Sequence, residues 1–166
     1  MDEMAELRAE VAALSQRLRA LEDHVAITQA VARYGPSVDS GSAEAAASLW
    51  TEDGVFDVPP FATWTGREEI AGMVRGDGHQ SLIHNGCGHV LTVPYITVEG
   101  DRARGWNYAL NIRYDHDADR FWIGRLSANT WEWSRTPEGW KVTTRVNHNL
   151  DGSSRPRDMF EGATGA

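Results

Sequence analysis

Apolar residues recur at alternating spacings of three and four along the start of the chain. The series is Met4, Leu7, Val11, Leu14, Leu18, Leu21 and Val25. This spacing forms one narrow stripe on a helix and matches the a and d positions of a heptad repeat. Arg17 then falls at a g position and Glu22 at an e position, where they can pair between chains. The pattern favours an oligomer-forming helix over residues 1–24; an amphipathic helix folded onto its own domain is the alternative.

A Gly35-Pro36 pair interrupts the next helical stretch, and a single acid, Asp39, follows it. Proline lacks the backbone donor and clashes with the preceding turn, so we expect the helix to end or kink there. Asp39 is then either a cap for the following helix, because Asp favours helix starts, or an acid directed into a pocket.

Four further segments precede the strand-rich half of the chain. Residues 42–50 predict a second short helix, and residues 54–58 predict a strand. Thr65 has Glu68 three residues later, which is the spacing of a capping box and predicts a third helix. Residues 76–88 are polar and glycine-rich, so we expect a loop.

Strand-like runs begin at His89. They read "HVLTVPYITV", "RARGWNYALNIRY", "FWIGRLSANTWEWSR" and "GWKVTTRVNHNL", and short turn sequences separate them. Short turns between consecutive strands predict an antiparallel meander. Helices followed by a curved antiparallel sheet make the expected fold class α+β.

Alternation along each run sorts side chains onto two faces of the sheet. The expected groupings are His89 with Leu91, Val93 and Tyr95; Asn107 with Asn111; Ser127 and Asn129 with Trp131 and Trp133; and Arg145 with Asn147, opposite Trp140 and Val142. A few hydrogen-bonding groups among aromatic side chains are typical of a ligand pocket, in which Trp131 would contact the substrate. The same pattern also fits the solvent face of a half-exposed sheet.

Composition narrows the class of protein. A chain of 166 residues with 41% hydrophobic and 24% charged residues fits one globular domain with a proper core. Its seven tryptophans indicate a thick core, a subunit interface or an apolar pocket. A net charge of −8 argues against nucleic acid or an anionic membrane as partner.

The cysteine, the histidines and the N-terminal residues give predictions about disulfides, metal binding and cellular location. Cys87 is the single cysteine, so no disulfide framework is expected. The acidic N-terminus does not fit a signal peptide, and no apolar run is long enough to span a membrane, which predicts a cytoplasmic protein. The spacing of His84 and His89 suits no metal motif, while His24, His79 and His116 fall in charged or loop contexts and are expected to be solvated. We expect no metal site.

Three stretches resemble a known superfamily: "AITQAVARYGPSVDSG", "GHVLTVPYITVEGDRARGWNYAL" and "SANTWEWSRTPEGWKVTTR". They are similar to the SnoaL-like branch of the nuclear transport factor 2-like fold, which includes scytalone dehydratase, bile-acid 7-alpha-dehydratase and hexachlorocyclohexane dehydrochlorinase. The resemblance covers about residues 20–150. It implies a cone-shaped curved antiparallel sheet with about three N-terminal helices, enclosing one pocket. The expected division is an N-terminal helix over 1–24, a SnoaL-like domain over 25–150 and a tail over 151–166.

The resemblance also implies site residues. Asp39 matches the acid at the end of the family's first long helix, and His89 matches the catalytic histidine. Tyr34 and Arg145 stand where relatives carry a functional tyrosine and an active-site arginine. Three positions match pocket residues of scytalone dehydratase, with asparagine in place of a second histidine at the first: Asn107, Ser127 and Asn129.

In the implied chemistry, Asp39 accepts a proton from one ring nitrogen of His89, which fixes the tautomer and raises the basicity of the other nitrogen. His89 would then remove a carbon-bound proton beside a carbonyl, while neighbouring polar groups stabilise the enolate or assist a departing oxygen. The expected enzyme is a cofactor-independent lyase, with dehydration first and isomerisation or cyclisation as variants. Its substrate would be a hydrophobic ring compound of steroid, terpenoid or polyketide type.

Other interpretations remain open at this stage. Asp39 and His89 would also suit a structural pair that closes the helix end onto the sheet. The whole chain would suit a non-catalytic protein that binds hydrophobic small molecules, or the small scaffold subunit of a ring-hydroxylating dioxygenase. An epoxide hydrolase of this fold would need two acids around an arginine, and Asp57 is the only extra acid near a pocket strand.

The tail and the first helix carry two further expectations. Met159 and Phe160 are the only sizeable apolar residues of the tail, and we expect them to contact the substrate as a latch over the pocket mouth. The heptad stripe implies a homo-oligomer, either a dimer or a trimer.

Overall fold

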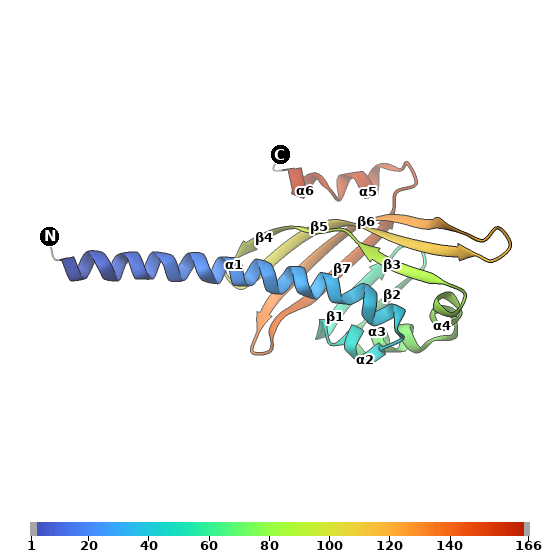
Figure 1. Cartoon of the computed structure of the whole chain (residues 1–166), viewed down its shortest axis with the longest axis horizontal. Helices are drawn as coiled ribbons and strands as arrows, with labels where there is room; N and C mark the ends of the chain where they lie inside the picture. Colours follow the sequence, from blue (N-terminus) through green and yellow to red (C-terminus); the bar gives the residue numbers. More distant parts are fainter. Residues whose placement is uncertain (1–2, 165–166) are drawn as a thin grey trace.

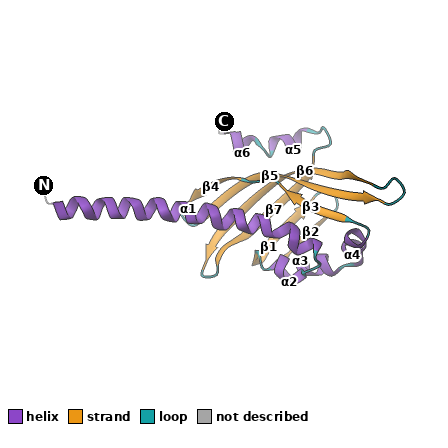
Figure 2. Ribbon diagram, in the orientation of Figure 1, coloured by secondary structure: helices purple, strands orange, loops and turns teal. Residues whose placement is uncertain are grey.

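The helices and the sheet form two main layers in the computed structural model, which describes residues 3–164 (Figure 1). Four helices lie on the inner side of a curved sheet: α1 (Glu3–Asp39), α2 (Ala43–Ala47), α3 (Gly66–Arg75) and α4 (Asp77–His84). Two short helices of the tail, α5 (Ser154–Asp158) and α6 (Glu161–Thr164), lie on the opposite side (Figure 2). This arrangement confirms the α+β class.

The sheet is curved and does not close. Its strands are β1 (Trp50–Val58), β2 (Ala62–Thr65), β3 (Cys87–Leu91), β4 (Tyr95–Glu99), β5 (Arg102–Asp115), β6 (Arg120–Thr136) and β7 (Gly139–Asn149). Their order is β2-β1-β7-β6-β5-β3, and β4 pairs with β5. The meander β5-β6-β7 is antiparallel as expected, whereas β1 runs parallel to β7.

The first helix does not break at Gly35-Pro36, contrary to the expectation from the sequence. Pro36 lies within the last turn, so its missing N–H removes a single hydrogen bond near the helix end. The hydroxyl of Ser37 donates to the carbonyl of Arg33 at 2.8 Å, and the surrounding residues of this turn are buried. Tertiary packing therefore offsets the lost hydrogen bond and carries the helix on to Asp39.

Residues 76–88 contain α4 rather than the expected loop. The sequence of this helix is polar and weak in helix propensity, but Leu82 faces a cavity and the side-chain amide of Gln80 donates to the carbonyl of Val74 at 2.7 Å.

The hydrogen bonds at the start of α3 differ from those of the predicted capping box. The backbone N–H of Thr65 donates to Glu69 at 2.7 Å, and the Thr65 side chain makes no capping bond.

Two irregularities change the expected faces of the sheet. The first predicted strand is split at Pro94 into β3 and β4, so Val93 and Tyr95 leave the inner face and are exposed. In β7, a bulge at Thr143 shifts the alternation. The bulge places Trp140 and Val142 on the same buried face as Arg145 and Asn147, and not on the opposite face.

The tail packs against the outer face of the sheet. The rings of Phe160 and Tyr108 lie 4.9 Å apart between centroids, and Gly162 lies against the ring of Trp106. Pro156 is buried there. Met159 and Phe160 do not line the inner cavity, so their interpretation as a latch and as substrate contacts is wrong.

The N-terminal part of α1 extends well beyond the sheet (Figure 1). Asp23 anchors the helix where it meets the sheet, because its carboxylate pairs with Arg135 at 2.7 Å and accepts from the indole of Trp140 at 2.9 Å. The Arg135 guanidinium keeps the pKa of Asp23 below its ordinary value. The heptad residues Met4, Leu7, Val11, Leu14, Leu18, Leu21 and Val25 are between 52% and 65% exposed.

None of the helices within residues 3–164 combines the length and the apolar character needed to cross a bilayer.

We expect the exposed heptad residues to join copies of this chain. Deleting residues 1–20, or changing Leu14 to Glu within the seam, should give a smaller particle by light scattering, because a charge at a d position opposes close helix packing. The matched control is Ala13→Glu, one position away and off the seam, which should keep the full assembly. An unchanged mass for Leu14→Glu would contradict a role for the seam.

Candidate active site

Asp39 and His89 form a close pair between the end of α1 and β3. One carboxylate oxygen of Asp39 lies 2.5 Å from Nδ1 of His89, and the other accepts the backbone N–H of His89 at 2.9 Å. Because a carboxylate only accepts, Nδ1 carries the proton and Nε2 presents a lone pair. The Asp39 side chain is 29% exposed and that of His89 is 13% exposed. This pair is the arrangement expected of an oriented general base.

Gly35 makes this pair possible. A Cβ atom at Gly35 would overlap the backbone carbonyl oxygen of His89, so only glycine lets α1 come this close to β3. Asp39 lies four residues later, one turn along the same helix face. The Gly-Pro step of the sequence therefore sets the distance between the helix and the strand and does not end the helix.

Asp39 is not a helix cap. The capping position of α2 belongs to Ser42, and both oxygens of Asp39 are directed to His89. A carboxylate at a helix C-terminus also meets the negative end of the helix dipole, and no basic residue lies in the last turn of α1 to offset it. An acid in this position contributes little to the helix itself, which favours a role at the site.

His89 borders a cavity of about 380 Å³ between the inner face of the sheet and the helices α1, α3 and α4. Its wall combines an apolar part with a polar part. The residues lining it include Tyr34, Phe56, Val58, Trp64, Met73, His79, Leu82, His89, Leu91, Asn111, Arg125, Arg145 and Asn147. Its size and mixed lining are those of a small-molecule site.

A second histidine lies beside the first. His79, on α4, has its ring centroid 5.3 Å from that of His89, and its Nε2 donates to the carbonyl of Val38 at 2.8 Å. In neutral His79, Nδ1 is therefore left as an acceptor. The expectation that His79 is solvated is wrong, because the segment expected to be a loop folds as α4 and places this residue in the cavity wall.

Arg145 is enclosed by aromatic rings. The guanidinium carbon lies 4.1 Å from the centroid of Tyr34, 4.6 Å from that of Phe56 and 4.3 Å from that of Trp131. The side chain is 2% exposed, and its Nε donates to Asn129 at 3.2 Å. Burial lowers the pKa of Arg145, and Tyr34 opposes this shift. The guanidinium stays protonated, so the aromatic faces stabilise a buried positive charge.

Arg125, on β6, supplies a second guanidinium to the cavity. It donates to Asn149 at 2.5 Å and to the side chain of Asn147 at 2.7 Å. Burial lowers the pKa of Arg125, and the charge of Arg145 lowers it further. Arg125 was not among the expected site residues, although the alternation that groups Ser127 with Asn129 places it on the same face, and continuous pairing with β5 carries that alternation through Asn111↔Arg125.

The remaining expected site residues support the cavity from behind and do not line it. Asn107 donates to the carbonyl of Thr92 at 2.8 Å and accepts from the indole of Trp131 at 2.9 Å. Asn129 accepts from Arg145 and, at 2.8 Å, from the amide of Asn147. Ser127 is buried and faces Asn149 at 3.3 Å. These side chains, with Trp131, hold the cavity wall in place.

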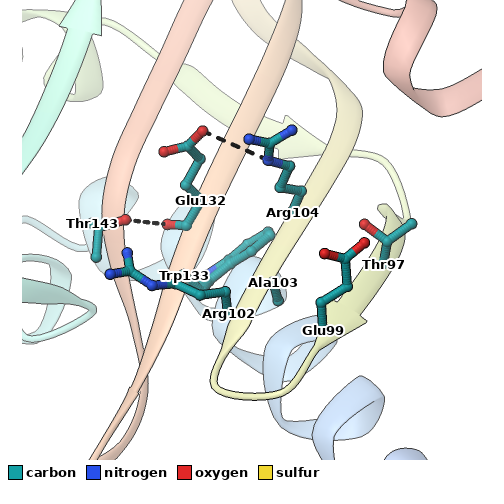
Figure 3. Close-up of a pocket in the computed structure, with 8 residues that line it drawn as sticks. All are labelled: Thr97, Glu99, Arg102, Ala103, Arg104, Glu132, Trp133 and Thr143. Carbon is teal, nitrogen blue, oxygen red and sulfur yellow. Dashed lines mark hydrogen bonds and ion pairs between the residues drawn. The ribbon is translucent and has the colours of Figure 1, made fainter.

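A second hollow lies on the outer face of the sheet (Figure 3). Arg104 faces Glu132 across neighbouring strands at 3.9 Å, and the hydroxyl of Thr143 donates to the carbonyl of Glu132 at 3.2 Å. Both charged side chains are more than half exposed. Exposed and mutually paired charges of this kind are typical of a solvated sheet surface, so we place the candidate active site at the inner cavity.

Residues 3–164 give no indication of a metal site or of a reactive thiol. No three His, Cys, Asp or Glu side chains among these residues gather in a way that could hold a metal ion. Burial raises the pKa of the Cys87 thiol, and the charge of Asp39 raises it further. A thiol with a raised pKa is a poor nucleophile.

Comparison with known proteins agrees with this fold. A family model described as a SnoaL-like domain matches residues 19–146. An NTF2-like protein with a cystatin-like fold from Novosphingobium aromaticivorans is 42% identical, with a TM-score of 0.85, over 97% of this chain and 99% of that one. No curated protein matches.

Two more distant solved structures share the fold alone. Hexachlorocyclohexane dehydrochlorinase LinA-type3 from Novosphingobium barchaimii is 19% identical, with a TM-score of 0.69, over 81% of this chain and 90% of that one. Aln2 from a Streptomyces species is 17% identical, with a TM-score of 0.70, over 81% of this chain and 95% of that one.

Gly35→Ala should separate α1 from β3. The added methyl group has no room beside the carbonyl of His89, so we expect the free energy of unfolding to fall by about 1–3 kcal/mol in urea denaturation. Gly72→Ala is the matched control, because Gly72 lies in α3 with nothing within 4 Å of its would-be Cβ. That change should raise stability by about 0.5–1 kcal/mol. Equal stability of the two variants would contradict the close-contact role of Gly35.

Proposed function

Because the chain belongs to the SnoaL-like family, we propose that it is a cofactor-independent enzyme of the lyase or isomerase type. It would remove a carbon-bound proton from a hydrophobic ring substrate, with dehydration as the leading reaction and isomerisation or cyclisation as variants. The observation that carries this proposal is the Asp39–His89 pair beside the cavity.

His89 would act as the general base. With Nδ1–H held by Asp39, Nε2 is the atom that accepts a proton from a carbon next to a carbonyl. The imidazolium that forms is stabilised by the carboxylate of Asp39, in the way that an acid supports a catalytic histidine elsewhere. The pair therefore combines orientation of the base with compensation of its developing charge.

The substrate carbonyl would be held by other groups of the cavity wall. Arg145 and the hydroxyl of Tyr34 are positively polarised groups at the cavity, and negative charge grows on the carbonyl oxygen as the proton leaves. In a dehydration, a hydroxyl leaves the neighbouring carbon and takes up a proton to depart as water. Protonated His89, or His79 beside it, is the acid available for that step.

The shape of the cavity supports a ring substrate. Val58, Trp64, Met73, Leu82 and Leu91 form its apolar wall. A volume of about 380 Å³ suits a compound with a few fused rings. No cofactor enters the proposed mechanism. We further propose that the protein works in the cytoplasm as a homo-oligomer joined through α1, without a nucleic-acid or membrane partner.

The dyad is tested with a general carbon acid, since a specific substrate is not needed for proton abstraction. Exchange of the ring α-protons of 2-tetralone in heavy water, followed by proton NMR, reports this step directly. His89→Ala and Asp39→Asn should each slow protein-dependent exchange by about 100- to 10,000-fold. The double variant should be little slower than the slower single variant, because the two residues act as one unit.

The control for the dyad is His24→Ala, which removes an exposed histidine far from the cavity and should leave exchange unchanged. Full protein-dependent exchange in a folded His89→Ala variant would refute His89 as the base, whereas no protein-dependent exchange with the unaltered protein would favour a binding protein without catalysis. Additive losses in the double variant would refute the coupled pair.

A further inference from the structure

The cavity holds two positive charges and no negative charge to balance them. Arg125 and Arg145 both line it, and none of its lining residues is an aspartate or glutamate. Asp39 lies behind His89 and is engaged by that residue. Such an excess of positive charge in the cavity is unusual in a chain whose net charge is −8.

Arg145 is the more deeply buried of the two arginines. It is 2% exposed, and its partners among the described residues are neutral: three aromatic rings, the hydroxyl of Tyr34 and the amide oxygen of Asn129. Its Nη1 atom has no hydrogen-bond partner there. A buried charge without an opposite charge is costly to maintain, so a protein that keeps one usually gives it an anionic partner at some stage of its function.

Arg125 repeats the same pattern at the cavity wall. Its partners are the amide oxygens of Asn147 and Asn149 and the ring of Phe61, whose centroid lies 5.2 Å away. The side chain of Asn147 also donates to Asn129, which accepts from Arg145. Neutral amides therefore connect the two guanidiniums from behind and fix them in place without neutralising either one.

A transient charge alone does not account for this arrangement. One guanidinium suffices for the single negative charge that grows on a carbonyl oxygen during proton removal. Two permanent charges fit an anion present on the substrate itself, because paired guanidiniums bind a carboxylate through several charge-assisted hydrogen bonds. Since the charge of Arg145 also lowers the pKa of Arg125, an anion between them would relieve their repulsion.

We infer that the substrate carries a carboxylate, which binds between Arg125 and Arg145 while its ring lies against the apolar wall of the cavity. This inference rests on the proposed function in so far as it names the substrate class of the same site. The apolar lining alone predicts an uncharged ring compound, and the two arginines add the prediction of a carboxylate on it.

The test compares 2-naphthoate with 2-naphthamide, which have the same ring and differ in charge. We expect isothermal titration calorimetry on the full chain to show at least tenfold tighter binding of the acid, with affinity falling as salt concentration rises. Arg125→Gln should remove most of this preference, because it weakens binding of the acid far more than binding of the uncharged amide. Arg104→Gln, which removes an arginine from the outer face, is the matched control and should keep the preference.

Equal binding of the two ligands, weaker binding of the acid, or no binding of the acid would overturn the inference. A preference that survives Arg125→Gln would overturn it as well. Arg125 is chosen because it is only partly buried, so its variant is expected to fold where a change at Arg145 is less safe.

The outcome is separate from that of the proposed function. His89→Ala should keep the preference for naphthoate, because the base does not bind the anion. If exchange of 2-tetralone depends on His89 but naphthoate has no advantage, only the inference fails. If naphthoate is preferred but exchange ignores the dyad, only the catalytic proposal fails.

Discussion

The close approach of α1 to β3 is the contact on which the rest of the candidate site depends. A glycine at position 35 brings the helix backbone against the carbonyl of His89, and the next turn then delivers both oxygens of Asp39 to the same residue. The backbone bond fixes the position of the carboxylate, and the ring bond fixes the tautomer. The close backbone contact between Gly35 and His89 thus determines which ring nitrogen of His89 is bonded to Asp39 and which is left for the cavity.

Arg145, elsewhere in the cavity wall, is stabilised in a different way from His89. Arg145 is surrounded by the faces of Tyr34, Phe56 and Trp131, which stabilise its charge without cancelling it. A carboxylate in their place would neutralise the guanidinium and make it unavailable to a ligand. The aromatic core therefore serves the site as well as the fold, and this accounts for part of the unusual tryptophan content.

The two ends of the first helix have different surroundings. Its C-terminal end supplies Tyr34 to the cavity wall and Asp39 to His89, whereas its N-terminal end presents an exposed apolar stripe away from the sheet. Asp23 and Arg135 mark the boundary between them, where the helix is fastened to the hairpin of β6 and β7. We therefore expect assembly and chemistry to be separable by substitution.

Local sequence signals were enough for the heptad stripe, the antiparallel meander and the α+β class, because period and turn chemistry act over a few residues. The resemblance led to Asp39 and His89, which the structure brings together, and to Tyr34 and Arg145, which it places at the same cavity. Four features were decided by tertiary contacts: the unbroken helix through Pro36, the helix around His79, the buried face that Trp140 shares with Arg145 because of the bulge in β7, and the packing of Phe160 on the outer face. Each depends on a neighbour far away in the chain, or on a bulge that shifts strand alternation by one residue, and no local pattern records either.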